Sequence, residues 1–186
     1  MKRPPSARRP QHRWRVVLPL ALLALLLTPS VALGVPPKRE ALPPPASIEA
    51  AAGEVCAFPV LIEFLDSKNK ALTFTDKSGT PVRQIITGKL RARVTNLVTE
   101  ESLVMNISGP AFLSFTEEGR PATVTLGGRA LLILRAGIDV APPGVFLTSG
   151  RVVLAISFTI DKEAGEVAAI VSQTGRMQDL CTVLAS

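Results

Sequence analysis

The chain has 186 residues, of which 47% are hydrophobic, and its 21 Lys and Arg against 15 Asp and Glu give a net charge of +6. This length predicts one domain with a core of its own. A positive charge is typical of proteins that bind nucleic acid, but six of the basic residues lie within residues 1–34. Residues 35–186 carry 15 residues of each sign and are neutral, so we expect no nucleic-acid partner.

Residues 1–34 have the three parts of a secretory signal peptide. A basic start that ends at Arg15 precedes an uncharged run from Val16 to Leu27, and small residues follow around Ala32. We therefore expect a cleaved signal peptide and a secreted, extracellular protein. Association with the cell envelope is the alternative location. The alternative is an uncleaved membrane anchor, because the uncharged stretch continues to Val35 and is then just long enough to span a bilayer.

The segment 35–54 is rich in proline, since five prolines lie within residues 35–46. Such a density favours an extended polyproline conformation, which separates a folded domain from whatever precedes it. We predict a Pro-rich linker over 35–54, followed by a single all-β domain over 55–186.

Residues 55–172 alternate between short apolar runs and turn-forming residues. In 151–161, Val152, Leu154 and Ile156 alternate with other residues at the period of a strand that has one buried face. We predict an antiparallel sandwich or barrel of about 9–11 short strands. Turns with Gly, Asn or Pro are expected at 66–69, 76–79, 117–120, 142–144, 148–150 and 161–165.

Two features stand out near the end of the chain. Gly128-Arg129 and Gly150-Arg151 each open a long apolar run, which indicates two similar hairpins. Further on, four residues at spacings i, i+3, i+4 and i+7 predict a short C-terminal helix: Met177, Leu180, Cys181 and Leu184.

A single disulfide is expected between Cys56 and Cys181. These are the two cysteines of the chain, they lie at the two ends of the predicted domain, and export places them in an oxidising compartment. The bond closes a loop of about 125 residues and stabilises the fold by about 4–5 kcal/mol. The alternative is a pair of buried free thiols.

The composition of residues 35–186 excludes several catalytic chemistries. This segment contains no His, Trp or Tyr, so it lacks the imidazole of His-dependent triads and of many zinc sites. It also contains no Gly-rich phosphate loop and no pair of Cys-x-x-Cys motifs. We expect no catalytic, cofactor-binding or metal-binding residues and no cofactor.

Acidic residues are the remaining candidates for acid–base or metal chemistry. The pairs Glu100-Glu101 and Glu117-Glu118 are expected in solvated turns, because neighbours on a strand point to opposite faces. A pair from distant positions, Asp139 with Asp161, stays open as an acid–base pair. Three carboxylates are oxygen donors of the kind that calcium binds: Asp161, Glu163 and Glu166. An ordinary hairpin turn is favoured here, because a calcium loop needs more ligands and a glycine at the bend.

One basic cluster is a candidate anion-binding patch. Lys89, Arg91 and Arg93 alternate on one face of a predicted strand, and Arg83 is a further member. The simpler interpretation is a charged edge that discourages pairing between strands of different molecules.

The chain also resembles uncharacterised small secreted β-rich proteins of high-GC Gram-positive bacteria. The resemblance covers roughly residues 53–184 and rests on Gly53–Val60, on Gly88-Lys89 before Val94–Leu97, and on Asp179–Cys181. It implies export, an all-β fold and a terminal cysteine pair, and it assigns no functional residue.

These observations favour a secreted, non-enzymatic β-domain that acts by protein contact or as an envelope or extracellular structural component. Exposed edge strands offer a route to a protein partner by strand addition. A membrane is expected as a partner only through an uncleaved signal segment. Two alternatives stay open: a β-barrel carrier of a small apolar ligand, and an enzyme that uses carboxylates without His.

Overall fold

The computed structural model describes residues 36–136, 142–157 and 166–185. The predicted signal peptide and Asp139, Asp161 and Glu163 lie outside these residues.

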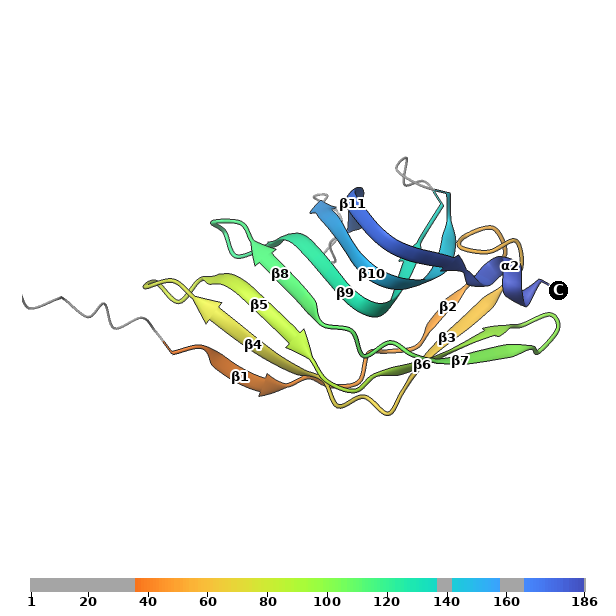
Figure 1. Ribbon diagram of the computed structural model, residues 1–186, viewed down its shortest axis with the longest axis horizontal. Helices are drawn as coiled ribbons and strands as arrows, with labels where there is room; N and C mark the ends of the chain where they lie inside the picture. Colours follow the sequence, from red (N-terminus) through yellow and green to blue (C-terminus); the bar gives the residue numbers. More distant parts are fainter. Residues whose placement is uncertain (1–35, 137–141, 158–165, 186) are drawn as a thin grey trace, which may run out of the picture. The chain divides into compact units, whose positions relative to one another are not determined.

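The described residues form two antiparallel sheets and one short helix, which confirms the all-β class and corresponds to a sandwich (Figure 1). The strands of the large sheet are, in spatial order, β1 (Lys38–Ala41), β4 (Lys70–Thr75), β5 (Pro81–Thr87), β8 (Ala111–Phe115), β9 (Pro121–Leu134), β10 (Gly144–Ser157) and β11 (Glu166–Asp179). The strands of the small sheet are β2 (Ile48–Ala50), β3 (Val60–Leu65), β6 (Arg91–Asn96) and β7 (Ser102–Asn106).

The Pro-rich segment, which we expected to be a linker, contributes a strand to each sheet. β1 pairs with β4 at the edge of the large sheet, and β2 pairs with β3 at the edge of the small one. Proline is tolerated beside an edge strand because one side of that strand needs no hydrogen-bond donor. Pro43, Pro44 and Pro45 lie between these two strands, where the chain passes from one sheet to the other.

The main core lies between the small sheet and one half of the large sheet. Alternate residues of β6 are buried, as the period of a one-faced strand requires, and Val94 is fully enclosed. Side chains from β3, β6, β10 and the terminal helix fill this core, among them Val60, Ile62, Val145, Leu180 and Leu184.

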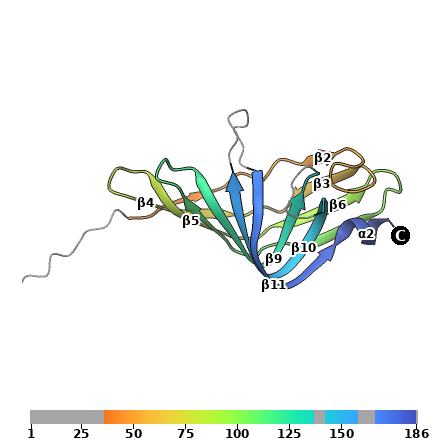
Figure 2. The same ribbon diagram turned by 90° about the horizontal axis from the view of Figure 1, so that it is seen from above.

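β9, β10 and β11 each have 14 residues and bend strongly along their length (Figures 1 and 2). Gly150, in β10, pairs with Gly128 of β9 on one side and with Gly175 of β11 on the other. All three glycines have positive φ, and a Cβ on Gly150 would collide with the carbonyl oxygen of Thr174. The turn predicted at 148–150 is therefore wrong, because Gly150 bends the strand without reversing it.

The bend brings the two halves of these strands onto one another. Leu132 and Leu134 precede the β9–β10 connection, whereas Val152 and Leu154 follow the glycine of β10, and all four pack in one buried cluster. A second, smaller core therefore lies within the fold of the large sheet itself.

The terminal helix, α2 (Leu180–Leu184), is shorter than predicted, because Met177 belongs to β11. Asp179 caps it by accepting hydrogen bonds from the backbone N–H groups of Cys181 and Thr182. The buried Asn96 side chain donates to the carbonyl oxygen of Leu184 at 2.9 Å, which holds the end of the helix to β6.

Cys56 and Cys181 form a disulfide, as their number and positions predict, with 5.4 Å between their Cα atoms. It ties the segment before β3 to α2 across 125 residues. A disulfide fits an extracellular protein, because such bonds persist in oxidising compartments. Among the residues described, no helix is long and apolar enough to cross a membrane.

Candidate functional site

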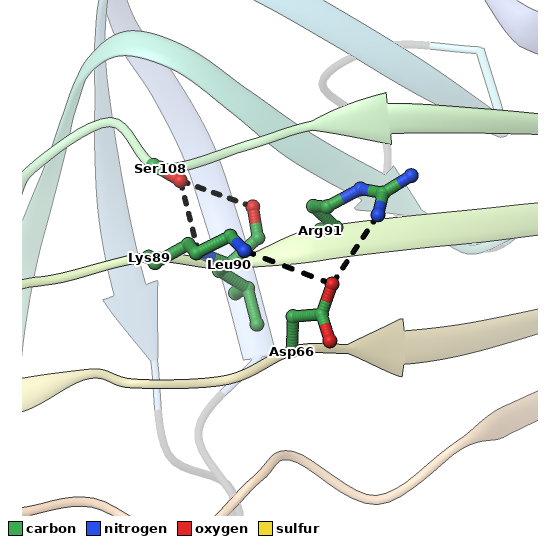
Figure 3. Close-up of polar contacts among 5 residues, drawn as sticks. All are labelled: Asp66, Lys89, Leu90, Arg91 and Ser108. Carbon is green, nitrogen blue, oxygen red and sulfur yellow. Dashed lines mark hydrogen bonds and ion pairs between the residues drawn. The ribbon is translucent and has the colours of Figure 1, made fainter.

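The basic cluster predicted at Lys89, Arg91 and Arg93 lies against two carboxylates. Asp66 lies between two of its members, with its Oδ2 atom 3.8 Å from Lys89 Nζ and 3.2 Å from Arg91 (Figure 3). Arg93 pairs with Glu63 of the neighbouring strand at 3.3 Å. Each pair is largely exposed and contributes about 0–1 kcal/mol. This face therefore carries both signs of charge, as a solvated strand does, and each of its three cations faces a carboxylate.

The fourth predicted member of that cluster, Arg83, lies on β5 of the other sheet, and its guanidinium stacks over the Phe74 ring, 4.2 Å from the centroid. The Ser108 hydroxyl, beside Lys89 and Arg91, is also occupied by hydrogen bonds within the protein. The Ser108 hydroxyl accepts from the N–H of Leu90 and donates to its carbonyl (Figure 3). Neither feature leaves a free binding group.

The acidic pairs lie where they were expected. Glu100 and Glu101 are exposed between β6 and β7, and Glu117 and Glu118 are exposed between β8 and β9. A hydrogen bond from the Thr116 side chain lowers the pKa of Glu118, which suits a carboxylate in a turn better than a general acid. These four residues show no geometry for acid–base catalysis.

Metal binding has no support in the part of the chain that the structure describes. No three His, Cys, Asp or Glu side chains gather there in a way that could hold a metal ion. The residues weighed as calcium ligands, Asp161 and Glu163, fall outside the described residues, as does the side chain of Glu166.

A different set of cations comes together at the bend of the large sheet. The sequence contains four Gly-Arg steps, and three of them lie within the long strands, one on each: Gly128-Arg129, Gly150-Arg151 and Gly175-Arg176. The three glycines are in register, so the three arginines are brought to the same place. The sequence showed the first two steps as an internal similarity, but not the third step or the register that joins them.

The strand register places these side chains on one face. Ser149 of β10 is paired with Arg129 on one side and Arg176 on the other. Residues paired across antiparallel strands point to the same face, and the Cα atoms of the two arginines are two strand spacings apart, about 10 Å. Arg151 lies two positions further along β10 and has the same alternation. We call Arg129, Ser149, Arg151 and Arg176 the arginine row.

A surface hollow of about 580 Å³ lies over the centre of this row. Its lining combines two guanidinium groups, a hydroxyl and an amide with two apolar side chains: Arg129, Leu147, Ser149, Arg176, Met177 and Gln178. Every polar side chain of this lining can donate a hydrogen bond, and none is acidic.

The arginines of the row differ from those of β6 in having no carboxylate partner among the side chains that the structure describes. All three are exposed, and no carboxylate of residues 36–136, 142–157 or 166–185 with a described side chain forms an ion pair with them. The nearest acidic residue along β11, Asp179, has its carboxylate occupied by the cap of α2. Like charges on neighbouring strands repel one another, so an anion in the hollow relieves that repulsion.

A second, apolar cavity of about 170 Å³ lies beside the row, at the junction of the two sheets. Its apolar lining comes from both sheets and includes Phe64, Ile86, Leu90, Ile107, Leu126, Leu131 and Ile133. Asn69 is its one polar side chain. Most of these residues are half-buried, so the cavity opens to solvent.

Comparison of the chain with protein-family models, with curated proteins and with solved structures gives no significant match, so the site stands on its own geometry.

Proposed function

We propose that the protein is a secreted, non-enzymatic binding domain that acts in the cell envelope or outside the cell. Its binding site is the arginine row, and the group that it binds is an anion, a carboxylate or phosphate of another protein or of an envelope component. The observation that carries the proposal is the row itself: three arginines, aligned by three glycines, with no carboxylate partner among the described side chains.

The residues of the hollow suit recognition better than catalysis. Arginine stays protonated at any physiological pH, so it neutralises an anion and does not serve as a base. Its planar guanidinium donates two parallel hydrogen bonds to a carboxylate or phosphate. Ser149 and Gln178 add neutral donors, and the lining contains no group that would activate the Ser149 hydroxyl as a nucleophile.

Two further features support the cellular location. The segment 1–34 has the composition of a signal peptide, and the Cys56–Cys181 disulfide suits an oxidising compartment. The neutral balance of residues 35–186 also argues that the cationic row is a local feature and no consequence of a basic chain.

The test is a titration of the folded domain with inorganic phosphate and with acetate, in which the NMR chemical shifts of the backbone amides are measured at each step. We expect saturable shifts at β9, β10 and β11 around the bend. Arg129→Gln and Arg176→Gln each weaken binding by roughly tenfold, because a hydrogen bond to a charged group is lost. The matched control is Arg39→Gln, which removes an exposed arginine of β1 that lies outside the hollow.

Shifts that are absent, or that Arg39→Gln reduces as much as Arg176→Gln does, contradict the proposal. Turnover of a substrate by the purified domain, lost in Ser149→Ala, would replace binding by catalysis as the function.

A further inference from the structure

We propose that the natural ligand of the arginine row is a small anionic amphiphile. Its carboxylate or phosphate head lies on the row, and its hydrocarbon part enters the apolar cavity at the junction of the sheets. This inference rests on the proposed function, because the head group occupies the anion site described above.

The hollow over the row and the apolar cavity share a wall on β9. Arg129 lines the hollow, whereas the next two residues, Ala130 and Leu131, line the cavity. The cavity residue Gly109 donates its backbone N–H to the carbonyl of Arg129 at 2.9 Å, so the linings of the two openings are in contact through the backbone. A bound ligand that extends from the guanidinium of Arg129 therefore reaches the mouth of the cavity within one or two residues.

The two openings also lie on the same face of this part of the sheet. Arg129 and Leu131 are two positions apart on β9 and point the same way. Leu131 is paired with Leu147, which lines the hollow, and both pack against the core below the small sheet. The surface between the head-group site and the cavity is thus apolar.

The lining of the cavity favours hydrocarbon over water. A buried water needs two to four polar partners, and Asn69 is the one polar side chain in the lining. The floor is a row of paired apolar residues, Ile86, Ala111 and Leu126, on three neighbouring strands. Space remains there because Ala111 is small and because a side chain at Gly109 would collide with the backbone of β9.

The volume sets the size of the hydrocarbon part. A dry cavity of about 150 Å³, lined by Leu, Ile and Phe, holds one benzene molecule in another protein. The cavity here has about 170 Å³ and therefore accepts about six carbon atoms. Each methylene moved from water into such a site strengthens binding by about fourfold.

The experiment is a titration of the native, disulfide-bonded domain with acetate, butanoate, hexanoate and octanoate, with octyl phosphate and octan-1-ol as further arms. We expect the affinity to rise by about fourfold per methylene until about six carbons are buried, and then to level off. Octan-1-ol binds much more weakly than octanoate because it lacks the charge. Octyl phosphate against octanoate shows which of the two head groups the row prefers.

Two variants separate the two parts of the site. Ala111→Phe fills the cavity and makes octanoate bind no better than acetate, with acetate binding unchanged. Arg176→Gln weakens acetate and octanoate by the same factor. The matched control, Ala122→Phe, adds the same ring to a half-buried residue of β9 outside the cavity and leaves the chain-length dependence intact.

The failures are distinguishable. Equal affinities for acetate and octanoate in the native protein overturn the amphiphile and leave the anion site standing. Equal affinities for octan-1-ol and octanoate overturn the anion site and with it the proposed function. If Ala111→Phe fails to fold, judged by its melting transition, Ile86→Phe on the neighbouring strand β5 repeats the test from a cavity residue outside the hollow.

Discussion

The protein has two groups of arginines on β-strands, and they differ in what faces them. On β6, Arg91 and Arg93 pair with Asp66 and Glu63. At the bend of the large sheet, Arg129, Arg151 and Arg176 pair with no described carboxylate. Solvent reaches both groups, although Arg93 is half-buried, so the difference in pairing comes from the neighbouring strands. A charged strand face is free to bind a ligand only when its cross-strand neighbours do not neutralise it.

The largest effect is expected from breaking the bend that assembles the row. Gly150→Ala places a Cβ against the carbonyl oxygen of Thr174 at positive φ, and we expect the free energy of unfolding to fall by roughly 2–4 kcal/mol. Gly79→Ala is the matched control, because Gly79 also has positive φ but has open space around it; its cost is about 1–2 kcal/mol. Denaturant unfolding measures both, and equal losses would contradict the close packing of the bend.

The next effect comes from giving the row the partner that β6 already has. Ser149→Asp puts a carboxylate between Arg129 and Arg176, so we expect phosphate binding to weaken by more than about tenfold. Ser149→Asn is the control, since it has nearly the same shape and no charge. If both variants bind phosphate equally, the charge of the row does not decide binding.

A smaller effect is expected from the reverse change on β6. Asp66→Asn removes the carboxylate that faces Lys89 and Arg91, and we expect a stability loss of about 0.2–1 kcal/mol. Asn is the suitable replacement because Asp66 has a positive φ, which Asn tolerates. The freed cations should give weak new phosphate-dependent shifts at β6. A stability loss well above this range would show that the β6 pairs have a structural role.

The smallest effect is expected on the pH dependence of stability, from the Asp76 carboxylate, which accepts hydrogen bonds from uncharged donors. The Ser78 hydroxyl and the backbone N–H of Thr80 hold the pKa of Asp76 below its ordinary value. A lowered pKa in the folded state stabilises the protein above the ordinary pKa, and this stabilisation is lost as the pH falls through the lowered value. Because Asp76 is fully exposed, we expect thermal melting of Asp76→Asn to depend on acid pH only slightly less than that of the native protein. If Asp76→Asn and the native protein have the same melting temperature at every pH, the hydrogen bonds of Asp76 do not contribute to stability.

Much of the fold could be predicted from local patterns. The alternation in 151–161 predicts the second half of β10, and the position of the two cysteines predicts their bond. Two predictions fail because a sheet context overrides local preference. The glycine of 148–150 bends a strand where a turn was expected, and the prolines of 35–54 flank edge strands where a spacer was expected.

The candidate site could be predicted only in part. The similarity of Gly128-Arg129 to Gly150-Arg151 is visible in the sequence. That the two lie side by side depends on the register between β9 and β10, which the sequence alone does not give. The cluster that the sequence did single out, Lys89 to Arg93, has partners about 25 to 30 residues away, which no local pattern discloses. The general lesson is that strand periodicity predicts which face a charge lies on, whereas pairing determines whether that charge is free.

The most direct test of the difference between the two arginine groups is NMR of the arginine Nε–H signals during titration with inorganic phosphate. We predict that Arg129 and Arg176 shift and saturate together, while Arg91 and Arg93 stay at their positions. Shifts of equal size in both groups, or at β6 alone, would contradict the claim that the arginines at the bend are free to bind an anion whereas those of β6 are not.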